Sequence, residues 1–221
     1  MTLLVICKYI IYFIFYSFVG WLLEGSLKLI EEHRFINRGF LIGPVLLIYG
    51  WGVLFIVLLI DGNVSDILSV FLKSILICSI LEYSTSFVME KLFKARWWDY
   101  SNRKFNINGR ICLETMIPFG IMGSLVVIFV HPFLVKMVGY LSNKLIITVG
   151  IILFILYLID NLISFNVMTR IKIEIKKYNV DSTETIKGKI KTWLMNNSVL
   201  FKRMYNAFPK FSITSKARSK K

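Results

Sequence analysis

The sequence predicts an all-α membrane protein: a bundle of five transmembrane helices followed by a basic cytoplasmic tail. Hydrophobic residues make up 56% of the 221 residues and charged residues only 18%, whereas soluble domains average roughly 45–50% and about 25%. The apolar residues gather in five runs of about 20 residues, the length that an α-helix needs to cross a bilayer. The number of Lys and Arg residues also alternates between successive loops.

The spans cover residues 4–23, 39–60, 67–89, 111–133 and 145–167, inside a transmembrane domain of residues 1–168. The first run is too long for the apolar region of a secretory signal peptide, and no small-residue cleavage site follows it. We therefore expect it to remain in the membrane. The three cysteines lie in or beside apolar runs, and we interpret them as small buried hydrophobic residues, not as metal ligands.

The basic residues predict the orientation of the bundle. The four loops and the tail contain 3, 0, 6, 2 and 14 Lys and Arg residues in chain order. Because these residues accumulate on the cytoplasmic side of a membrane, we expect the first loop, the third loop and the tail in the cytoplasm. The N-terminus is then outside and the C-terminus inside.

The tail, residues 169–221, holds 14 basic and 3 acidic residues. A position next to anionic lipid explains this charge, so we expect no nucleic-acid partner. Apolar residues recur in the tail at roughly helical spacing, which predicts an amphipathic helix on the membrane surface. They are Ile190, Trp193, Leu194, Leu200, Phe201, Met204 and Phe208. A helix that docks on a cytoplasmic partner fits the same pattern.

Polar side chains towards the cytoplasmic ends of the spans are the candidate functional residues. Four predicted helices each carry a carboxylate in the inner half of the membrane. Charged groups at this depth are costly, so they usually face the bundle interior or a wet cavity. We predict a substrate or ion pathway that opens into a polar cytoplasmic vestibule. Its residues are Glu24, Tyr49, Glu82, Glu114 and Asp160.

The third span carries a polar face, because Glu82, Ser86 and Glu90 are spaced four residues apart and lie on one side of a helix. The basic partners available at the membrane boundary are Arg38, Arg96 and Arg110. Interhelical clamps that hold the bundle together are the alternative interpretation of the same residues. The sequence leaves both interpretations open.

The second span is rich in helix-perturbing residues. They are Arg38, Gly39, Gly43, Pro44, Gly50 and Gly52. Pro44 lacks a backbone donor and favours a kink, and the glycines permit close helix contact. A discontinuous helix whose freed carbonyls line a pathway is the alternative, because broken helices in membranes are buried in protein or line water.

The third loop combines aromatic, charged and turn-forming residues. They are Arg96, Trp97, Trp98, Asp99, Tyr100, Asn106, Gly109 and Arg110. Such aromatics often form an interfacial belt. Asn108-Gly109, however, favours a tight turn with positive φ. We therefore also consider a loop that folds back as a cytoplasmic lid, with Arg96 and Arg110 meeting Glu90, Asp99 or Glu114.

Over residues 24–132 the chain resembles the ABC-transporter type IV family, the CmpB-like bacterial membrane permease proteins. The motifs that carry the resemblance are Arg38-Gly39-Phe40, Gly43-Pro44, Tyr49-Gly50-Trp51-Gly52, Leu81-Glu82-Tyr83, Trp97-Trp98-Asp99-Tyr100 and Gly109-Arg110-Ile111-Cys112-Leu113. The chain departs from the family in the stretch Val45–Ile48, where members usually have a proline. The resemblance implies a multi-pass permease of the bacterial cytoplasmic membrane.

These patterns favour a transport protein over an enzyme. The chain has no G-x-x-x-x-G-K-[ST] phosphate loop, so a permease role would require a separate cytoplasmic ATPase. We expect a homo-oligomer, since five helices enclose little, and no metal ion or cofactor. An enzyme acting on a lipid or isoprenoid at the inner interface, or a non-catalytic membrane scaffold, remains an alternative.

Overall fold

The computed structural model describes residues 2–60, 66–93, 95–96, 98–177, 199–200, 203 and 212–213. Four of its helices are long and apolar enough to cross a membrane, which confirms four of the five predicted spans as candidates. They are α1 (Leu3–Glu32), α3 (Ile67–Phe93), the continuous stretch Leu113–Gly139 and the apolar part of α6 (Asn143–Lys177). The helix α2 (Leu47–Leu59) is apolar but shorter.

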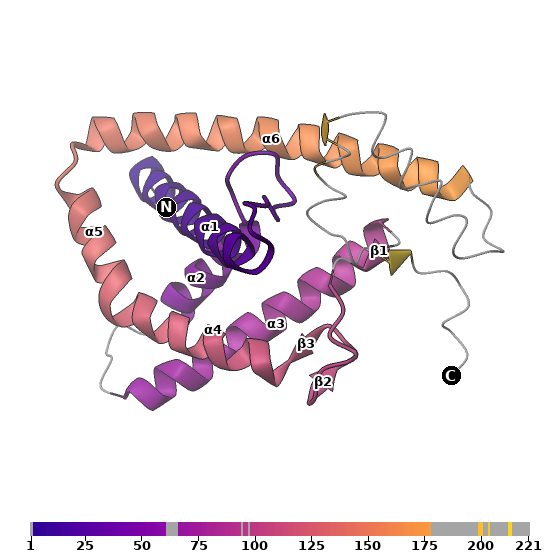
Figure 1. Ribbon diagram of the computed structural model, residues 1–221. Coiled ribbons are helices and arrows are strands. Elements are labelled where there is room, and N and C mark those ends of the chain that lie inside the picture. The colour runs from indigo at the N-terminus through magenta and orange to yellow at the C-terminus, as the bar shows by residue number, and fades with distance from the viewer. Residues whose placement is uncertain are drawn as a thin grey trace.

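The stretch Leu113–Gly139 consists of α4 (Leu113–Leu125), a π-helical turn η1 (Val126–Val130) and α5 (His131–Gly139). Pro132 explains the change of helix type at this point, since proline provides no N–H for the preceding turn. The N–H of His131 bonds instead to the carbonyl of Val126, five residues earlier. The ribbon changes direction between α4 and α5 (Figure 1).

The helix α1 packs against α2 and α6, and α3 packs against α4 (Figure 1). Glycines allow these close contacts, as is usual between membrane helices. A Cβ atom on Gly50 of α2 would lie 2.7 Å from the carbonyl oxygen of Phe13 on α1, and closer still to Ser17 Oγ. A Cβ atom on Gly123 of α4 would lie 2.5 Å from Ser74 on α3.

Contacts along the helices show the relative directions of the elements that pack together. Cys7 and Phe13 of α1 meet Gly150 and Tyr157 of α6 in the same order, so these two helices are parallel. By the same reasoning α2 is antiparallel to α1, and α4 is antiparallel to α3. This arrangement gathers the polar residues of several helices at one end of the bundle, which we call the polar end.

The predicted second span requires a correction. Residues 33–46 are not helical, so the prediction of a helix from residue 39 was wrong for its first eight positions. A helix of 13 residues rises only about 20 Å, less than the ~30 Å hydrocarbon core. Gly50 and Gly52 lie buried inside an unbroken α2. The break therefore falls before the helix, around Gly43 and Pro44.

Other boundaries also differ from the prediction. The helix α1 continues past residue 23 to Glu32, and α6 continues past residue 167 to Lys177. The amphipathic helix predicted around residues 190–208 lies outside the described residues, apart from 199–200 and 203. Two short strands from distant parts of the chain, β1 (Ala95–Arg96) and β4 (Ser212–Ile213), form an antiparallel pair.

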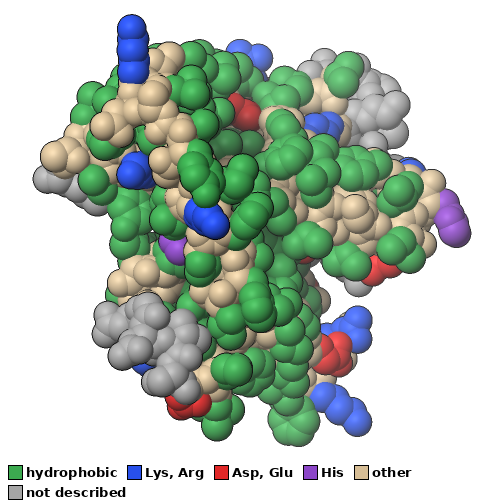
Figure 2. All heavy atoms as spheres, turned by 90° about the vertical axis from the view of Figure 1, so that its left-hand side faces the viewer, with side chains coloured by type: hydrophobic (Ala, Val, Ile, Leu, Met, Phe, Trp, Pro, Cys, Tyr) green, Lys and Arg blue, Asp and Glu red, His purple; other side chains and the backbone are tan. Residues whose placement is uncertain are grey.

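Hydrophobic side chains cover much of the molecular surface in Figure 2. Large apolar residues are exposed on the outer faces of the long helices, for example Leu162 (68%), Phe133 (66%) and Ile80 (59%). The buried face of α3 is instead rich in polar residues, including Ser74, Ser79 and Glu82. Apolar outside and polar inside is the distribution expected of a bundle in lipid.

We predict that Gly50→Ala destabilises the protein by about 1–3 kcal/mol, the usual effect of overpacking, because the new methyl group collides with Phe13 and Ser17. Thermal unfolding in detergent measures the change. Gly139→Ala is the control, since a Cβ atom there meets nothing within 4 Å. Equal unfolding temperatures for the two variants would contradict the close packing of α1 and α2.

Candidate functional site

Asp160 of α6 holds the non-helical segment of residues 33–46 in place at the polar end. Its carboxylate accepts hydrogen bonds from the backbone N–H groups of Ile42 and Gly43, both at 2.8 Å. Ser164, one helical turn later, donates to the same carboxylate at 3.0 Å. A Cβ atom on Gly43 would lie 2.8 Å from Asp160 Oδ2, so the absence of a side chain there allows this close approach.

Further bonds satisfy the polar backbone of the same segment. Asn37 accepts a hydrogen bond from the N–H of Gly39 at 2.8 Å and donates to the carbonyl of Ile42 at 3.1 Å. Arg203, from the C-terminal tail, donates to the carbonyl of Gly39 at 2.8 Å and also to that of Leu41. Leu41 is fully buried. Protein groups thus replace water around this non-helical backbone, as membrane burial requires.

Glu24 links α1 to the segment and to α2. Its carboxylate pairs with Arg38 at 3.2 Å and accepts a hydrogen bond from the hydroxyl of Tyr49 at 2.8 Å. The ring of Tyr49 packs on Gly20 of α1, where a Cβ atom would collide with it. Two predicted pathway residues, Glu24 and Tyr49, therefore lie together, in an arrangement that also clamps the helices.

Glu82 is buried on α3, with 5% of its surface exposed. It accepts long hydrogen bonds from the Tyr100 hydroxyl (3.3 Å) and from Thr115 Oγ1 (3.5 Å). Burial and the negative charge of Glu82 raise the pKa of Tyr100, so the phenol stays protonated and donates. Among the described residues, no Lys, Arg or His forms an ion pair with Glu82.

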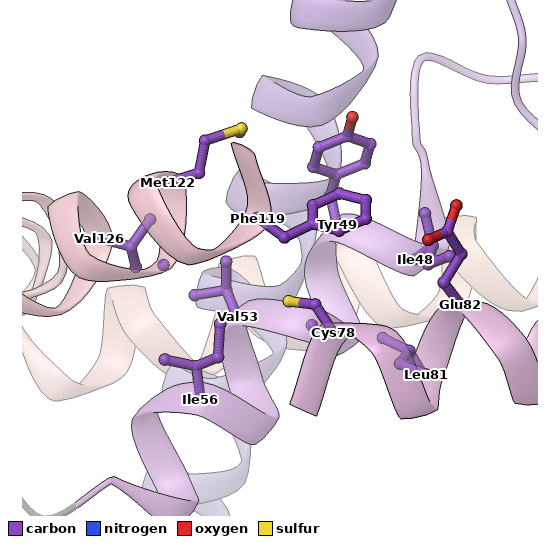
Figure 3. A pocket seen from close by; sticks show the side chains of 12 residues that line it. Ile48, Tyr49, Val53, Ile56, Cys78, Leu81, Glu82, Phe119, Met122 and Val126 are labelled. Atoms are coloured by element: carbon purple, nitrogen blue, oxygen red, sulfur yellow. The ribbon is translucent and has the colours of Figure 1, made fainter. Parts of the chain in front are cut away.

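Glu82 and Tyr49 also line a cavity of about 60 Å³ between α2, α3 and the α4–η1 stretch. The remaining lining is apolar or lacks a charge. It consists of Ile48, Gly52, Val53, Ile56, Cys78, Leu81, Phe119, Met122, Gly123 and Val126. Figure 3 shows the Glu82 carboxylate and the Tyr49 hydroxyl towards one side of the view, with Met122 and Val126 towards the other. The lining of the cavity is thus almost entirely apolar, with Glu82 and Tyr49 on one side of it.

The third loop folds back against α3. Arg110 is buried, pairs with Glu90 at 2.7 Å, donates to Ser86 at 3.1 Å and lies over the ring of Phe87. Trp98 donates from its indole nitrogen to the carbonyl of Arg110 at 2.9 Å. Arg110 and Glu90 therefore meet, as the lid interpretation expects.

A compact turn completes this loop. Asn108 and Gly109 both adopt positive φ, which confirms the predicted turn. Asn106 accepts a hydrogen bond from the N–H of Gly109 at 2.9 Å, and Asp99 accepts bonds from Ser101. Short strands β2 (Asn106–Ile107) and β3 (Ile111–Cys112) pair across the turn. Trp97 and the side chain of Arg96 lie outside the described residues.

Glu114 is not brought together with the other pathway residues. Its side chain is 56% exposed and pairs with Arg103 at 2.9 Å. The neighbouring Thr115 faces Glu82 instead. Sequence reasoning missed Thr115, Asn37 and Ser164. The spacing of Ser164, four residues after Asp160, was the one available signal.

We predict that Asp160→Asn destabilises the protein by about 1–3 kcal/mol, because an amide offers one acceptor oxygen where Ile42 and Gly43 present two donors. Thermal unfolding in detergent measures this. Glu114→Gln, at an exposed position, is expected to stay within about 0.5 kcal/mol of the unsubstituted protein. A fully stable Asp160→Asn protein would refute the role of this carboxylate.

The family model ABC_trans_CmpB, described as "Putative ABC-transporter type IV", matches residues 11–165, more than two thirds of the chain. No curated protein and no solved structure matches this chain. The matched region contains Asp160, Glu24, Glu82 and the loop between α3 and α4, together with the helices that position them. The chain therefore belongs to the ABC-transporter type IV family.

Proposed function

We propose that this protein is the membrane-embedded permease subunit of a transport system, and that Glu82 lies on its pathway. One observation carries the proposal: Glu82 is buried beside a cavity and has no cationic partner among the described residues. Intramembrane carboxylates of this kind usually mark ion or substrate pathways. Membership of the family and the four candidate membrane-spanning helices support it.

The chemistry of the site suits a proton or a small cation. Glu82 can bind either one, and the Tyr100 hydroxyl keeps its donor directed at the carboxylate, whereas the hydroxyl of Thr115 lies 3.5 Å from the carboxylate and bonds the carbonyl of Cys112 at 2.9 Å. A cavity of about 60 Å³ has room for a few water molecules, whereas pockets for organic ligands are roughly 300–1,000 Å³. A larger solute would require the helices to separate, or a second copy of the chain to complete the pathway.

In our proposal the polar end faces the cytoplasm and forms the vestibule. Arg38, Arg103 and Arg110 all lie there, and basic residues mark the cytoplasmic side of membrane proteins. Energy would come from a separate ATPase subunit docked at this end, because the chain carries no phosphate loop. The pairs Glu24–Arg38 and Glu90–Arg110 act as clamps around the pathway.

We predict that Glu82→Gln abolishes transport-coupled activity and changes thermal stability little. The amide keeps an acceptor for Tyr100 or Thr115 but carries neither a negative charge nor a titratable proton. The measurement is the ATPase activity of the complex purified from native membranes, with Glu114→Gln as the matched control. An active Glu82→Gln complex would remove Glu82 from the pathway.

The permease role itself is tested by purification in mild detergent, followed by mass spectrometry of bound proteins and lipids. A stoichiometric ATPase subunit is the expected result. A homo-oligomer that carries a specific lipid or isoprenoid would instead support the lipid-directed enzyme. A protein with neither partner, in which Glu82→Gln lowers only stability, would support the scaffold.

A further inference from the structure

The loop between α3 and α4 presents two large apolar side chains to its surroundings. Phe105 is 78% exposed and Ile107 is 52% exposed. Two cations, Arg103 and Lys104, are exposed directly beside them. Apolar side chains that enter the acyl region, next to cations that reach phosphate groups, are the combination that binds a membrane interface.

The tip of this loop lies beside α3, not beyond its end. Asn108 donates a hydrogen bond to the hydroxyl of Tyr83 at 2.9 Å. Tyr83 precedes the last residue of α3, Phe93, by about 15 Å along the helix axis. The loop therefore turns back along the helix and brings Ile107 to the depth of the apolar bundle surface. In Figure 1 the strands β2 and β3 lie next to α3 and the start of α4.

Internal hydrogen bonds keep the tip in a fixed conformation. The N–H of Tyr100 donates to the carbonyl of Gly109 at 2.8 Å, and Asn106 donates to the carbonyl of Arg103 at 2.7 Å. Phe105 has φ of 49°, in the left-handed region. Such a conformation costs a non-glycine residue about 1–3 kcal/mol and persists only when its surroundings hold it. The hydrogen bonds of the loop offset the conformational cost at Phe105 and keep its side chain exposed.

We propose that residues 99–112 form an interfacial hairpin that inserts Phe105 and Ile107 into the membrane and binds anionic phospholipid headgroups through Arg103 and Lys104. Two features favour lipid over a soluble partner. The tip lies at the depth of Tyr83, and the flanking helices expose Phe87 (42%) and Leu113 (43%), which continue an apolar surface around it. Insertion of this hairpin requires a membrane but does not require transport activity.

Spin labels at Phe105→Cys and Ile107→Cys, in proteoliposomes, test the insertion by collision with oxygen and with a water-soluble nickel chelate. We expect an oxygen-to-nickel collision ratio several-fold higher at both positions than at Asn102→Cys, an exposed polar position in the same loop. Unsubstituted protein corrects for the native cysteines, of which Cys7 and Cys112 are buried. Nickel accessibility equal to that at Asn102→Cys would overturn the proposal in favour of a soluble partner.

The contact with anionic headgroups is tested by changing the lipid composition of the vesicles. Vesicles that contain phosphatidylglycerol are expected to raise the collision ratio of the label at position 105 above its value in pure phosphatidylcholine. Lys104→Gln should remove most of this difference, and it leaves the Arg103–Glu114 pair intact. A ratio that is the same in both vesicles would overturn the anionic-headgroup contact. Both readouts are independent of any ATPase or transport activity, so failure here leaves the function of Glu82 untouched.

Discussion

The two hydrogen bonds from the backbone of Ile42 and Gly43 to Asp160 are the interaction on which the polar end of the bundle depends. Hydrocarbon supplies no partners for backbone groups, so a non-helical segment at membrane depth needs them from protein. With this segment held, α2 begins at Leu47, Arg38 pairs with Glu24, and Tyr49 lies against both α1 and the cavity. The position of the cavity therefore follows from one carboxylate on the last long helix.

The carboxylates of the polar end divide into two kinds by their partners, and only Glu82 is buried, whereas Glu24, Glu90 and Asp160 are half-buried. Glu24 and Glu90 each face an arginine, and Asp160 faces backbone donors. Their negative charges are compensated locally, which suits a structural role. Among the described residues, Glu82 receives only two long hydrogen bonds, both from neutral hydroxyl groups. In the proposed pathway, a carboxylate with so little compensation would be the group most responsive to a proton or a cation.

The sequence predicted most of the helices, because twenty apolar residues in a row leave few alternatives to a membrane helix. It failed at residues 39–46, where hydropathy alone did not distinguish an apolar helix from an apolar loop whose partner is 117 residues away. The depth of a residue along its helix could also be predicted, so the Arg110–Glu90 pair was one of several contacts considered for the third loop. The sequence did not predict which side of a helix faces the bundle interior, because that depends on how the helices pack. Glu114 and Thr115 are adjacent in sequence, yet only Thr115 turns towards Glu82.

The distance in sequence between the non-helical segment and its partners has a consequence for biogenesis. The N–H groups of Ile42 and Gly43 need a carboxylate that is synthesised 118 and 117 residues later, and the carbonyl of Gly39 is bonded by Arg203, 164 residues away. While the ribosome is still making the middle of the chain, these three backbone groups lack their later partners and must be satisfied by water. Closure of the polar end is therefore a late step that follows the synthesis of α6.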